Sequence, residues 1–416
     1  MFGFGTPGKP RPGPPGDTSK LVGLDLTATR LQGVSSAAGR QRPLALDAHG
    51  TTDLPMMLHL GGRAPAIGGA AVAVCRKSPH LVCAGFLPLL GQATLWQADR
   101  VKLTPEGALA AVFDAVRPAV AAETDAAELA LPSYLSAAQA RAVAELAAKA
   151  KLPVRGTVVA ALAVVAHRAA HLTGTAPPDD AGRAEWVVPL PRDPDGPVSV
   201  VVIDADDFAL TASVLSVEQG AATLVASGVW PRASVRLWKD RLLDAMADRC
   251  VRLCRRDPRD SADAEQALYD QLDAALDRVR AGQPVALTVR SAHWYQDLVH
   301  QPEEFDAFCA PLARLAAEGI FDLVRTAGLP LPPTAVWLTH AAARLPGLAG
   351  AVHRTSPEST SVQALPPHAV TEAAAALALR RLAGQAGRGF LDSVVPLDEP
   401  APGRASTSPT SRESRR

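Results

Sequence analysis

Apolar and polar residues alternate along two segments of the chain, a spacing that is typical of strands. Residues 20–36 read KLVGLDLTATRLQGVSS and alternate about a central LTA. Residues 198–217 read VSVVVIDADDFALTASVLSV and alternate about the acidic sequence DADD. Because a period of two places one face of a strand in a core, each segment is predicted to form a strand, a tight turn and a returning strand.

Helical spacing of apolar residues is clear in residues 104–122, TPEGALAAVFDAVRPAVAA. Thr104 is the predicted N-cap, Pro105 the first helical residue and Glu106 an acidic residue of the first turn. These start signals and the periodicity together predict a helix.

The next segments continue an α/β order. Residues 126–134 indicate a short buried strand, and residues 136–152 a helix that Ser136 caps. Residues 153–167, PVRGTVVAALAVVAH, are predicted to form a turn that leads into another helix.

The second half of the chain is predicted to repeat this logic after its own hairpin. The expected elements are a helix at 235–256, a helix at 262–282, a strand at 284–290, a helix at 302–329, a strand at 334–339 and a final helix at 367–387.

The chain length allows two separate cores, because single cores stop growing near about 250 to 300 residues. We predict one lobe over residues 21–175 and a second over residues 198–390, joined by a loop at 176–197 that is rich in Pro, Asp and Gly. The leader, residues 1–20, and the tail, residues 391–416, have the Pro, Gly and Ser content of disordered segments.

Charge and cysteine content limit the class of partner. Lys+Arg and Asp+Glu both total 42, so no excess charge attracts nucleic acid or an acidic membrane surface. The longest apolar run is too short to span a membrane. Five scattered cysteines fit a reduced compartment, and the predicted location is cytoplasmic. The expected partner is a protein that the sequence does not identify.

Several segments match, in order, the motifs of one known family. VGLDLTATRLQGV at 22–34 is similar to a first phosphate loop, G-I-D-L-G-T-T, and the hairpin at 198–217 to a second, D-L-G-G-G-T-F-D. Residues 129–167 resemble a strand, a Y-x-x-x-x-Q-R helix and the segment N-E-P-T-A-A-A-L-A-Y-G. AVWLTHAAARLP at 335–346 resembles the adenosine loop V-G-G-S-T-R-I-P, and LPPHAVTEAAAALA at 365–378 the final helix P-D-E-A-V-A-Y-G-A-A.

Together these segments, from Leu21 to Ala386, resemble a divergent nucleotide-binding domain of the Hsp70 family without its peptide-binding domain. The resemblance implies a two-lobed, actin-like ATPase fold of the actin, Hsp70 and sugar-kinase superfold, in which each lobe is a mixed sheet with flanking helices, a duplicated ribonuclease-H-like unit. That family clamps ATP and Mg²⁺ between its lobes, with glycine-rich hairpins against the phosphates. Asp25, Thr29 and Asp204 keep the matching acidic and hydroxyl positions.

Most other positions of the implied site have changed. The residues that replace glycine or hydroxyl residues in the phosphate and adenosine loops are Thr27, Ala28, Asp206, Asp207, Phe208, Ala209, His340 and Ala341. Leu87 aligns with the family's cleft lysine, and Gly156 with the carboxylate of N-E-P-T. If Asp206 and Asp207 point into the cleft, each repels a triphosphate by roughly 3 kcal/mol per unit charge at an effective dielectric near 20.

These changes predict a pseudo-ATPase that acts as a scaffold or regulator and needs no cofactor. Two alternatives remain. One is a residual ATP-binding or ATPase protein related to chaperones, with ATP and Mg²⁺ as cofactors, and the other is an actin-like filament or cell-division protein.

A second chemical interpretation of the acidic residues is a divalent-cation site built from Asp25, Asp204, Asp206 and Asp207. The simpler interpretation, which we favour, is that Asp206 and Asp207 only make the hairpin turn, since Asp tolerates left-handed backbone geometry and solvent.

Two pairs of residues four positions apart could share a helix face. His167 and His171 have a metal-ligand spacing but no evident third ligand, so exposed helix polarity is the preferred interpretation. Cys250 and Cys254 are interpreted as buried small side chains.

Trp230 directly precedes the sequence PRASVRLWKD, and Trp238 lies within it. Aromatic residues beside arginine are typical of partner surfaces, but packing between the lobes is the favoured interpretation.

Overall fold

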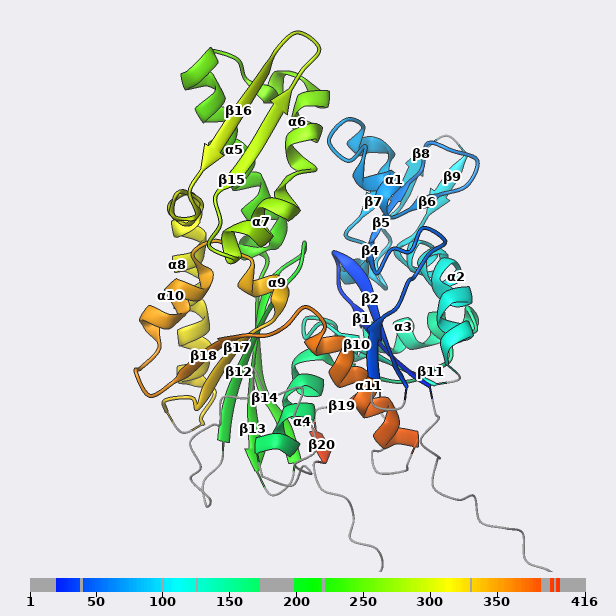
Figure 1. Ribbon diagram of the computed structural model, residues 1–416. Coiled ribbons are helices and arrows are strands. Elements are labelled where there is room, and N and C mark those ends of the chain that lie inside the picture. The colour runs from blue at the N-terminus through cyan, green and yellow to red at the C-terminus, as the bar shows by residue number, and fades with distance from the viewer. Residues whose placement is uncertain are drawn as a thin grey trace, which may run out of the picture.

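The computed structural model describes residues 20–37, 40–98, 100–124, 126–172, 198–218, 221–329, 331–382, 390–392 and 394–396. The predicted leader at 1–19, most of the tail and the predicted loop at 176–197 lie outside these ranges. Within them the chain is α/β, as predicted, with several sheets and flanking helices (Figure 1).

The first large sheet is mixed and has the order β19-β11-β10-β1-β2-β3, with β4 also paired to β2. Its strands are β1 (Leu21–Leu26), β2 (Arg30–Ala37), β3 (Arg40–Pro43), β4 (Asp53–Pro55), β10 (Ala127–Leu131), β11 (Val154–Val159) and β19 (Phe390–Asp392). β1 pairs antiparallel with β2 and parallel with β10, so the predicted first hairpin forms the centre of this sheet.

The second large sheet repeats that order as β18-β17-β12-β13-β14-β20. Its strands are β12 (Val198–Ala205), β13 (Leu210–Glu218), β14 (Ala221–Trp230), β17 (Ala335–Leu338), β18 (Ser361–Ala364) and β20 (Val394–Pro396). β12 pairs antiparallel with β13 and parallel with β17, just as β1 pairs with β2 and β10. The repeated unit of each large sheet is therefore three antiparallel strands followed by two parallel ones, to which β19 adds a further parallel strand in the first sheet and β20 a further antiparallel strand in the second.

Three small sheets lie beyond the large ones, away from β19 and β20 (Figure 1). They consist of β5 (Met57–His59), β6 (Ala66–Ile67) and β7 (Val82–Ala84); β8 (Trp96–Ala98) and β9 (Val101–Leu103); and β15 (Val285–Arg290) and β16 (Tyr295–His300).

Helices flank the sheets in both the N-terminal and the C-terminal parts of the chain. They are α1 (Gly69–Val72), α2 (Pro105–Glu123), α3 (Ala137–Lys149), α4 (Ala160–Leu172), α5 (Val235–Cys254), α6 (Ala262–Tyr269), α7 (Leu272–Arg280), α8 (Pro302–Thr326), α9 (His340–Ala343), α10 (Leu348–Thr355) and α11 (Ala369–Leu382). Two predicted caps are confirmed: the Thr104 hydroxyl accepts a hydrogen bond from Gly107 N–H at 3.1 Å, and Ser136 forms a capping box with Gln139. None of the helices in the described ranges combines the length and apolar character needed to cross a bilayer.

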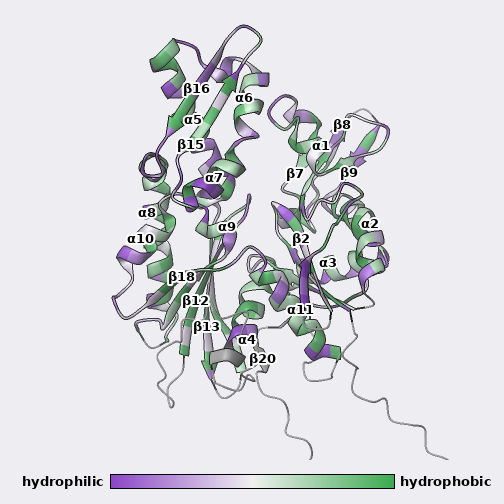
Figure 2. Cartoon of the chain, in the orientation of Figure 1, coloured by the Kyte–Doolittle hydropathy of each residue, from purple (hydrophilic) through white to green (hydrophobic). Residues whose placement is uncertain are grey.

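Helices α4 and α11 join the two large sheets at their base (Figure 1). One apolar cluster contains residues of both helices together with strands of both sheets, among them Val158, Val202 and Leu377. The approach of α11 to β1 is close enough to require a glycine, because a Cβ on Gly23 would lie 1.8 Å from the backbone oxygen of Thr371. Figure 2 shows the apolar residues along β12 and β13, and polar ones on α7.

Several features of the fold differ from the sequence predictions. The predicted turn at residues 153–159 is strand β11, because its β-branched residues pair in parallel with β10. The predicted helix at 262–282 is two helices, and at the break between them the Gln271 side chain binds both backbone groups of Thr288. Strands β3–β9, β14, β16 and β18 and the short helices α1, α9 and α10 were not predicted. Residues 391–396, predicted to belong to a disordered tail, contribute to β19 and β20, which pair with β11 and β14.

Candidate functional site

A cavity of about 40 Å³ lies between the two hairpins, α9 and the start of α11. Six of the predicted site residues line it: Asp25, Thr27, Thr29, Asp204, His340 and Ala341. A cavity needs about 10 to 15 Å³ of such volume to hold one water, so this one has room for a few waters. The sequence therefore identified residues of one site, although the remaining space is small.

The other predicted residues of the hairpin tips, Ala28, Asp206, Asp207 and Phe208, do not line the cavity. The carboxylate of Asp206 lies instead between the two tips. Its Oδ2 accepts hydrogen bonds from Ala28 N–H at 2.9 Å and from the Tyr134 hydroxyl at 2.6 Å. Its Oδ1 accepts from the N–H groups of Phe208 and Ala209, both at 2.9 Å.

These contacts decide what Asp206 does in the turn. It makes the turn, as we favoured from the sequence, because Oδ1 binds the two N–H groups that follow it. The expected reason, a left-handed backbone and exposure to solvent at Asp206, was wrong. In the described part of the chain the non-glycine residues with positive φ are Lys151 and Arg255, and Asp206 is only 3% exposed. The repulsion of a triphosphate, which assumed that the side chain points into the cleft, does not apply to Asp206 in this position.

Burial raises the pKa of Asp206, and the hydrogen bonds from Tyr134, Ala209 and Ala28 oppose that increase. The pKa of Tyr134 is shifted as well. Burial and then the charge of Asp206 hold the pKa of Tyr134 well above its usual value. Tyr134 is therefore a proton donor to Asp206 at any physiological pH. Its ring also meets Phe208 edge to face, with the centroids 4.9 Å apart.

Asp207 joins the same two tips through its backbone, because its N–H donates to Thr29 Oγ1 at 2.7 Å. Its own Oδ1 is buried and has no hydrogen-bond partner in the described ranges. Burial raises the pKa of Asp207 to about 6, while the charge of Lys239 lowers it.

Asp25 and Asp204 are the two acidic residues that do line the cavity. Asp204 Oδ1 accepts from the Thr339 hydroxyl at 2.5 Å and from Ala205 N–H at 2.9 Å. Asp25 is 5% exposed, and its Oδ1 has no hydrogen-bond partner among the described residues. Burial and then the charge of Asp204 raise the pKa of Asp25 to about 7. Near neutral pH, Asp25 is therefore partly protonated.

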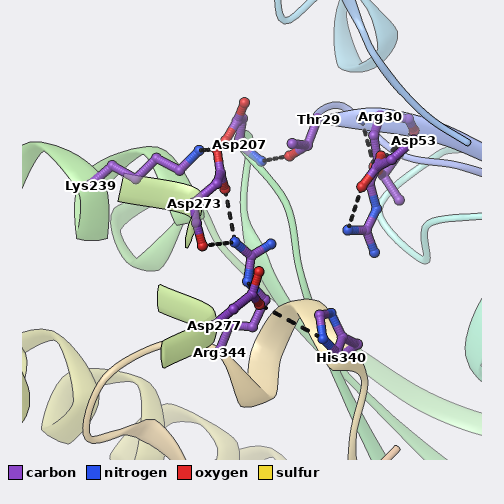
Figure 3. A network of polar contacts seen from close by, with 10 residues as sticks. Thr29, Arg30, Asp53, Asp207, Lys239, Asp273, Asp277, His340 and Arg344 are labelled. Atoms are coloured by element: carbon purple, nitrogen blue, oxygen red, sulfur yellow. Dashed lines mark hydrogen bonds and ion pairs between the residues drawn. The ribbon is translucent and has the colours of Figure 1, made fainter. Parts of the chain in front are cut away.

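A network of ion pairs occupies the side of the cavity formed by the C-terminal residues (Figure 3). Asp273 accepts from Lys239 Nζ at 2.7 Å and from Arg344 Nη2 at 3.0 Å. Asp277 Oδ1 lies 2.8 Å from Arg344 Nε and 3.9 Å from His340 Nε2. The cations nearest the implied adenosine loop are thus paired with carboxylates of the same chain.

His340 remains neutral in this network. Burial and then the positive charges of Arg280, Arg344 and Arg30 lower the pKa of His340 to about 3. On the opposite hairpin, Arg30 Nη1 lies 3.4 Å from Asp53 Oδ2.

Leu87 and Gly156, which align with the family's catalytic groups, lie outside the cavity lining. Leu87 is buried in the core of the first sheet. Gly156 faces a buried ion pair, since its Cβ would lie 2.9 Å from Arg381 Nε and 3.0 Å from Glu128 Oε1. Neither position supplies a cation or a carboxylate to the cavity.

The metal interpretations gain no support. In the described residues no three His, Cys, Asp or Glu side chains are grouped to hold an ion, which applies to the four aspartates as well. His167 lies on α4, and the side chain of His171 is outside the described set. Cys250 is buried and Cys254 is half-buried, and both are free thiols.

The tryptophans pack, as favoured, but not between the lobes. Trp238 is fully buried in the core of the second sheet, and its Nε1 donates to the Pro346 carbonyl at 3.2 Å. Trp230 packs against Gly228 and Gly319 beside the same core. The predicted interlobe position is wrong for Trp238 because α5 turns that side chain toward its own sheet.

Sequence reasoning did not identify Tyr134, whose hydroxyl donates to Asp206. Tyr134 was visible as the first residue of the Y-x-x-x-x-Q-R match, but its hydroxyl contact with Asp206 depends on the fold. No protein-family model and no curated protein sequence matches this chain.

Proposed function

We propose that this chain is an Hsp70-like pseudo-ATPase that acts as a protein-interaction scaffold or regulator. The repeated strand order of the two large sheets supports a two-lobed, actin-like fold, because a duplicated unit gives the same order twice. The helices α4 and α11 that join the sheets agree with that architecture.

The observation that carries the proposal is the position of the Asp206 carboxylate. In the family that the chain resembles, backbone N–H groups of the two hairpins receive the phosphates. Here the N–H groups of Ala28, Phe208 and Ala209 donate to Asp206. An anion of the chain itself uses the donors that a phosphate would need.

The rest of the site does not fit ATP and Mg²⁺ either. The cavity of about 40 Å³ compares with roughly 300 to 1,000 Å³ for typical ligand pockets. Leu87 and Gly156 stand where the family has a lysine and a carboxylate, and phosphoryl transfer depends on such electrostatic groups.

One observation favours the alternative of residual nucleotide binding. Asp25 Oδ1 is buried beside the cavity without a hydrogen-bond partner in the described residues, so one inherited group of the site remains unsatisfied.

Isothermal titration calorimetry with Mg-ATP and Mg-ADP separates the two functions. The pseudo-ATPase predicts no binding heat at ligand concentrations up to millimolar and no phosphate release. Micromolar binding of either nucleotide would establish the alternative. Proteins that copurify with the chain from its native cells, and are lost when the chain is absent, are the matching test of the scaffold role.

A further inference from the structure

Two polar contacts connect the N-terminal part of the chain, residues 20–159, with the C-terminal part, residues 198–364. They lie at different places along the interface and share no residue. At the base, α4 and α11 already join the two parts through an apolar cluster. Away from that base, the polar contacts add further connections between the two parts.

The first contact joins the hairpin tips. Asp206 accepts from Ala28 N–H and from the Tyr134 hydroxyl, and Asp207 N–H donates to Thr29. Asp206 is almost completely buried. Separating the tips would expose its carboxylate to water, and the Ala28 N–H and the Tyr134 hydroxyl would lose their acceptor.

The second contact joins the segment that follows α1 to α6 and α5. Gln266 is 1% exposed, and both ends of its amide cross the interface. Its Oε1 accepts from Arg76 N–H at 2.7 Å, and its Nε2 donates to the Val72 carbonyl at 2.8 Å. In Figure 1, α1 and α6 face each other across the upper part of the molecule.

Charged side chains surround that amide. The Arg76 guanidinium pairs with Asp240, lies 3.5 Å from Glu265 and covers the Tyr269 ring at 4.6 Å from its centroid. Lys77 Nζ lies 2.7 Å from Asp263. Each ion pair that crosses the interface joins a cation of the N-terminal part, Arg76 or Lys77, to an anion of the C-terminal part, so these pairs attract the two parts to each other.

We propose that these two contacts form a latch that holds the parts closed without any ligand. A cleft that needs a ligand to close leaves donors free for that ligand. In this chain the bridging groups are the Asp206 carboxylate and the Gln266 amide, which belong to the protein itself. The inference concerns the conformation of the protein and does not require the proposed function to hold.

The two contacts are coupled if both form only in the same closed conformation of the protein. The backbone N–H of Ala28 can exchange with solvent only when the tips separate. The Arg76 side chain contacts Asp240, Glu265 and Tyr269, none of which is at the tips. A substitution at Arg76 that accelerates exchange at Ala28 therefore acts through opening of the interface.

Site-resolved hydrogen exchange of the full chain tests the latch. In the wild type we expect the amides of Ala28 and Asp207 to be protected without nucleotide. In Arg76→Ala we expect both amides to exchange about tenfold faster, since a part-buried ion pair and its hydrogen bonds together contribute on the order of that factor. The matched control is Arg259→Ala, because the partners of Arg259, which are Asp244, Asp248 and Asp257, all belong to the C-terminal part.

Unprotected wild-type amides, or equal acceleration in the control variant, would overturn the latch. So would unchanged exchange in Arg76→Ala. Small-angle X-ray scattering gives an independent measurement, with a larger radius of gyration expected for Arg76→Ala/Asp206→Asn than for wild type. Nucleotide binding in the calorimeter, with wild-type amides still protected beforehand, would reject the pseudo-ATPase while the latch stands.

Discussion

Asp206 Oδ2 and the backbone N–H of Ala28 are 2.9 Å apart in the structure and 178 positions apart in the sequence. The same carboxylate accepts from Tyr134, Phe208 and Ala209. An acidic residue that suggested repulsion at a hairpin tip is therefore a bridging acceptor between the two hairpins.

Replacing Asp206 with Ala should destabilise the protein by about 2 to 5 kcal/mol. The substitution leaves three backbone donors and one hydroxyl without their acceptor in a buried place, and each such group costs roughly 1 to 3 kcal/mol, reduced where water can enter. Guanidinium chloride unfolding measures the loss. Asp322→Ala is the control, since the Asp322 pair with Arg325 is exposed and should contribute less than about 1 kcal/mol. A loss in Asp206→Ala as small as in the control would contradict the assigned contacts.

Formate should partly restore Asp206→Ala. The substitution frees N–H groups that converge on one point, and a small carboxylate can bind such a group of donors. We expect the midpoint of thermal unfolding of the variant to increase with formate, relative to chloride at the same ionic strength, because a ligand of the folded state stabilises it. The wild type should show no such difference. An equal response of both proteins would mean that formate acts elsewhere.

Replacing Arg381 with Leu should destabilise the protein by about 3 to 5 kcal/mol. Arg381 and Glu128 form an ion pair whose side chains are 3% and 0% exposed, and removing one member leaves a buried charge. Denaturant unfolding should show that Glu128→Leu/Arg381→Leu is more stable than Arg381→Leu alone. If the double variant is the less stable of the two, the penalty comes from packing rather than from the unpaired carboxylate.

Asp25 should make the protein less stable as the pH rises. Its pKa is raised to about 7 in the folded protein from 3.8 in a free chain, so the folded state holds a proton that the unfolded state has lost. Stability from this group is full below about pH 4, falls up to about pH 7 and is constant above. Asp25→Asn should remove this part of the slope and be more stable than wild type at pH 8 by about 2 to 4 kcal/mol, with the difference disappearing near pH 4. Unfolding measured from pH 4 to 8 checks the sign, and an unchanged slope would contradict it.

Local signals predicted the local features of this fold. Thr104 and Ser136 cap their helices because a cap depends on residues within one turn. Residues 153–159 were misread because the signals of Pro153 and Gly156 outweighed the β-branched residues, whose strand is decided by pairing with β10.

Contacts between distant segments were not predictable from the same signals. The motif matches did predict that Asp25, Asp204 and His340 share one site, because each lies at the end of a recognisable strand or loop, and all three line the cavity. Gln266 and Arg76 lie 190 positions apart in segments without a motif, and only the fold, which brings the segment after α1 next to α6, makes them neighbours. The burial of Asp206 likewise depends on Tyr134, which lies in the segment between β10 and α3.

The contact of α11 with Gly23 has a consequence for the order in which the protein can fold during its synthesis. β1 leaves the ribosome long before the helix that covers it, α11, which ends at Leu382. One face of β1 therefore stays uncovered until α11 has been made. A truncation before Ala369 would remove the cover of the earliest strand and should impair the N-terminal sheet more than its distance in sequence suggests.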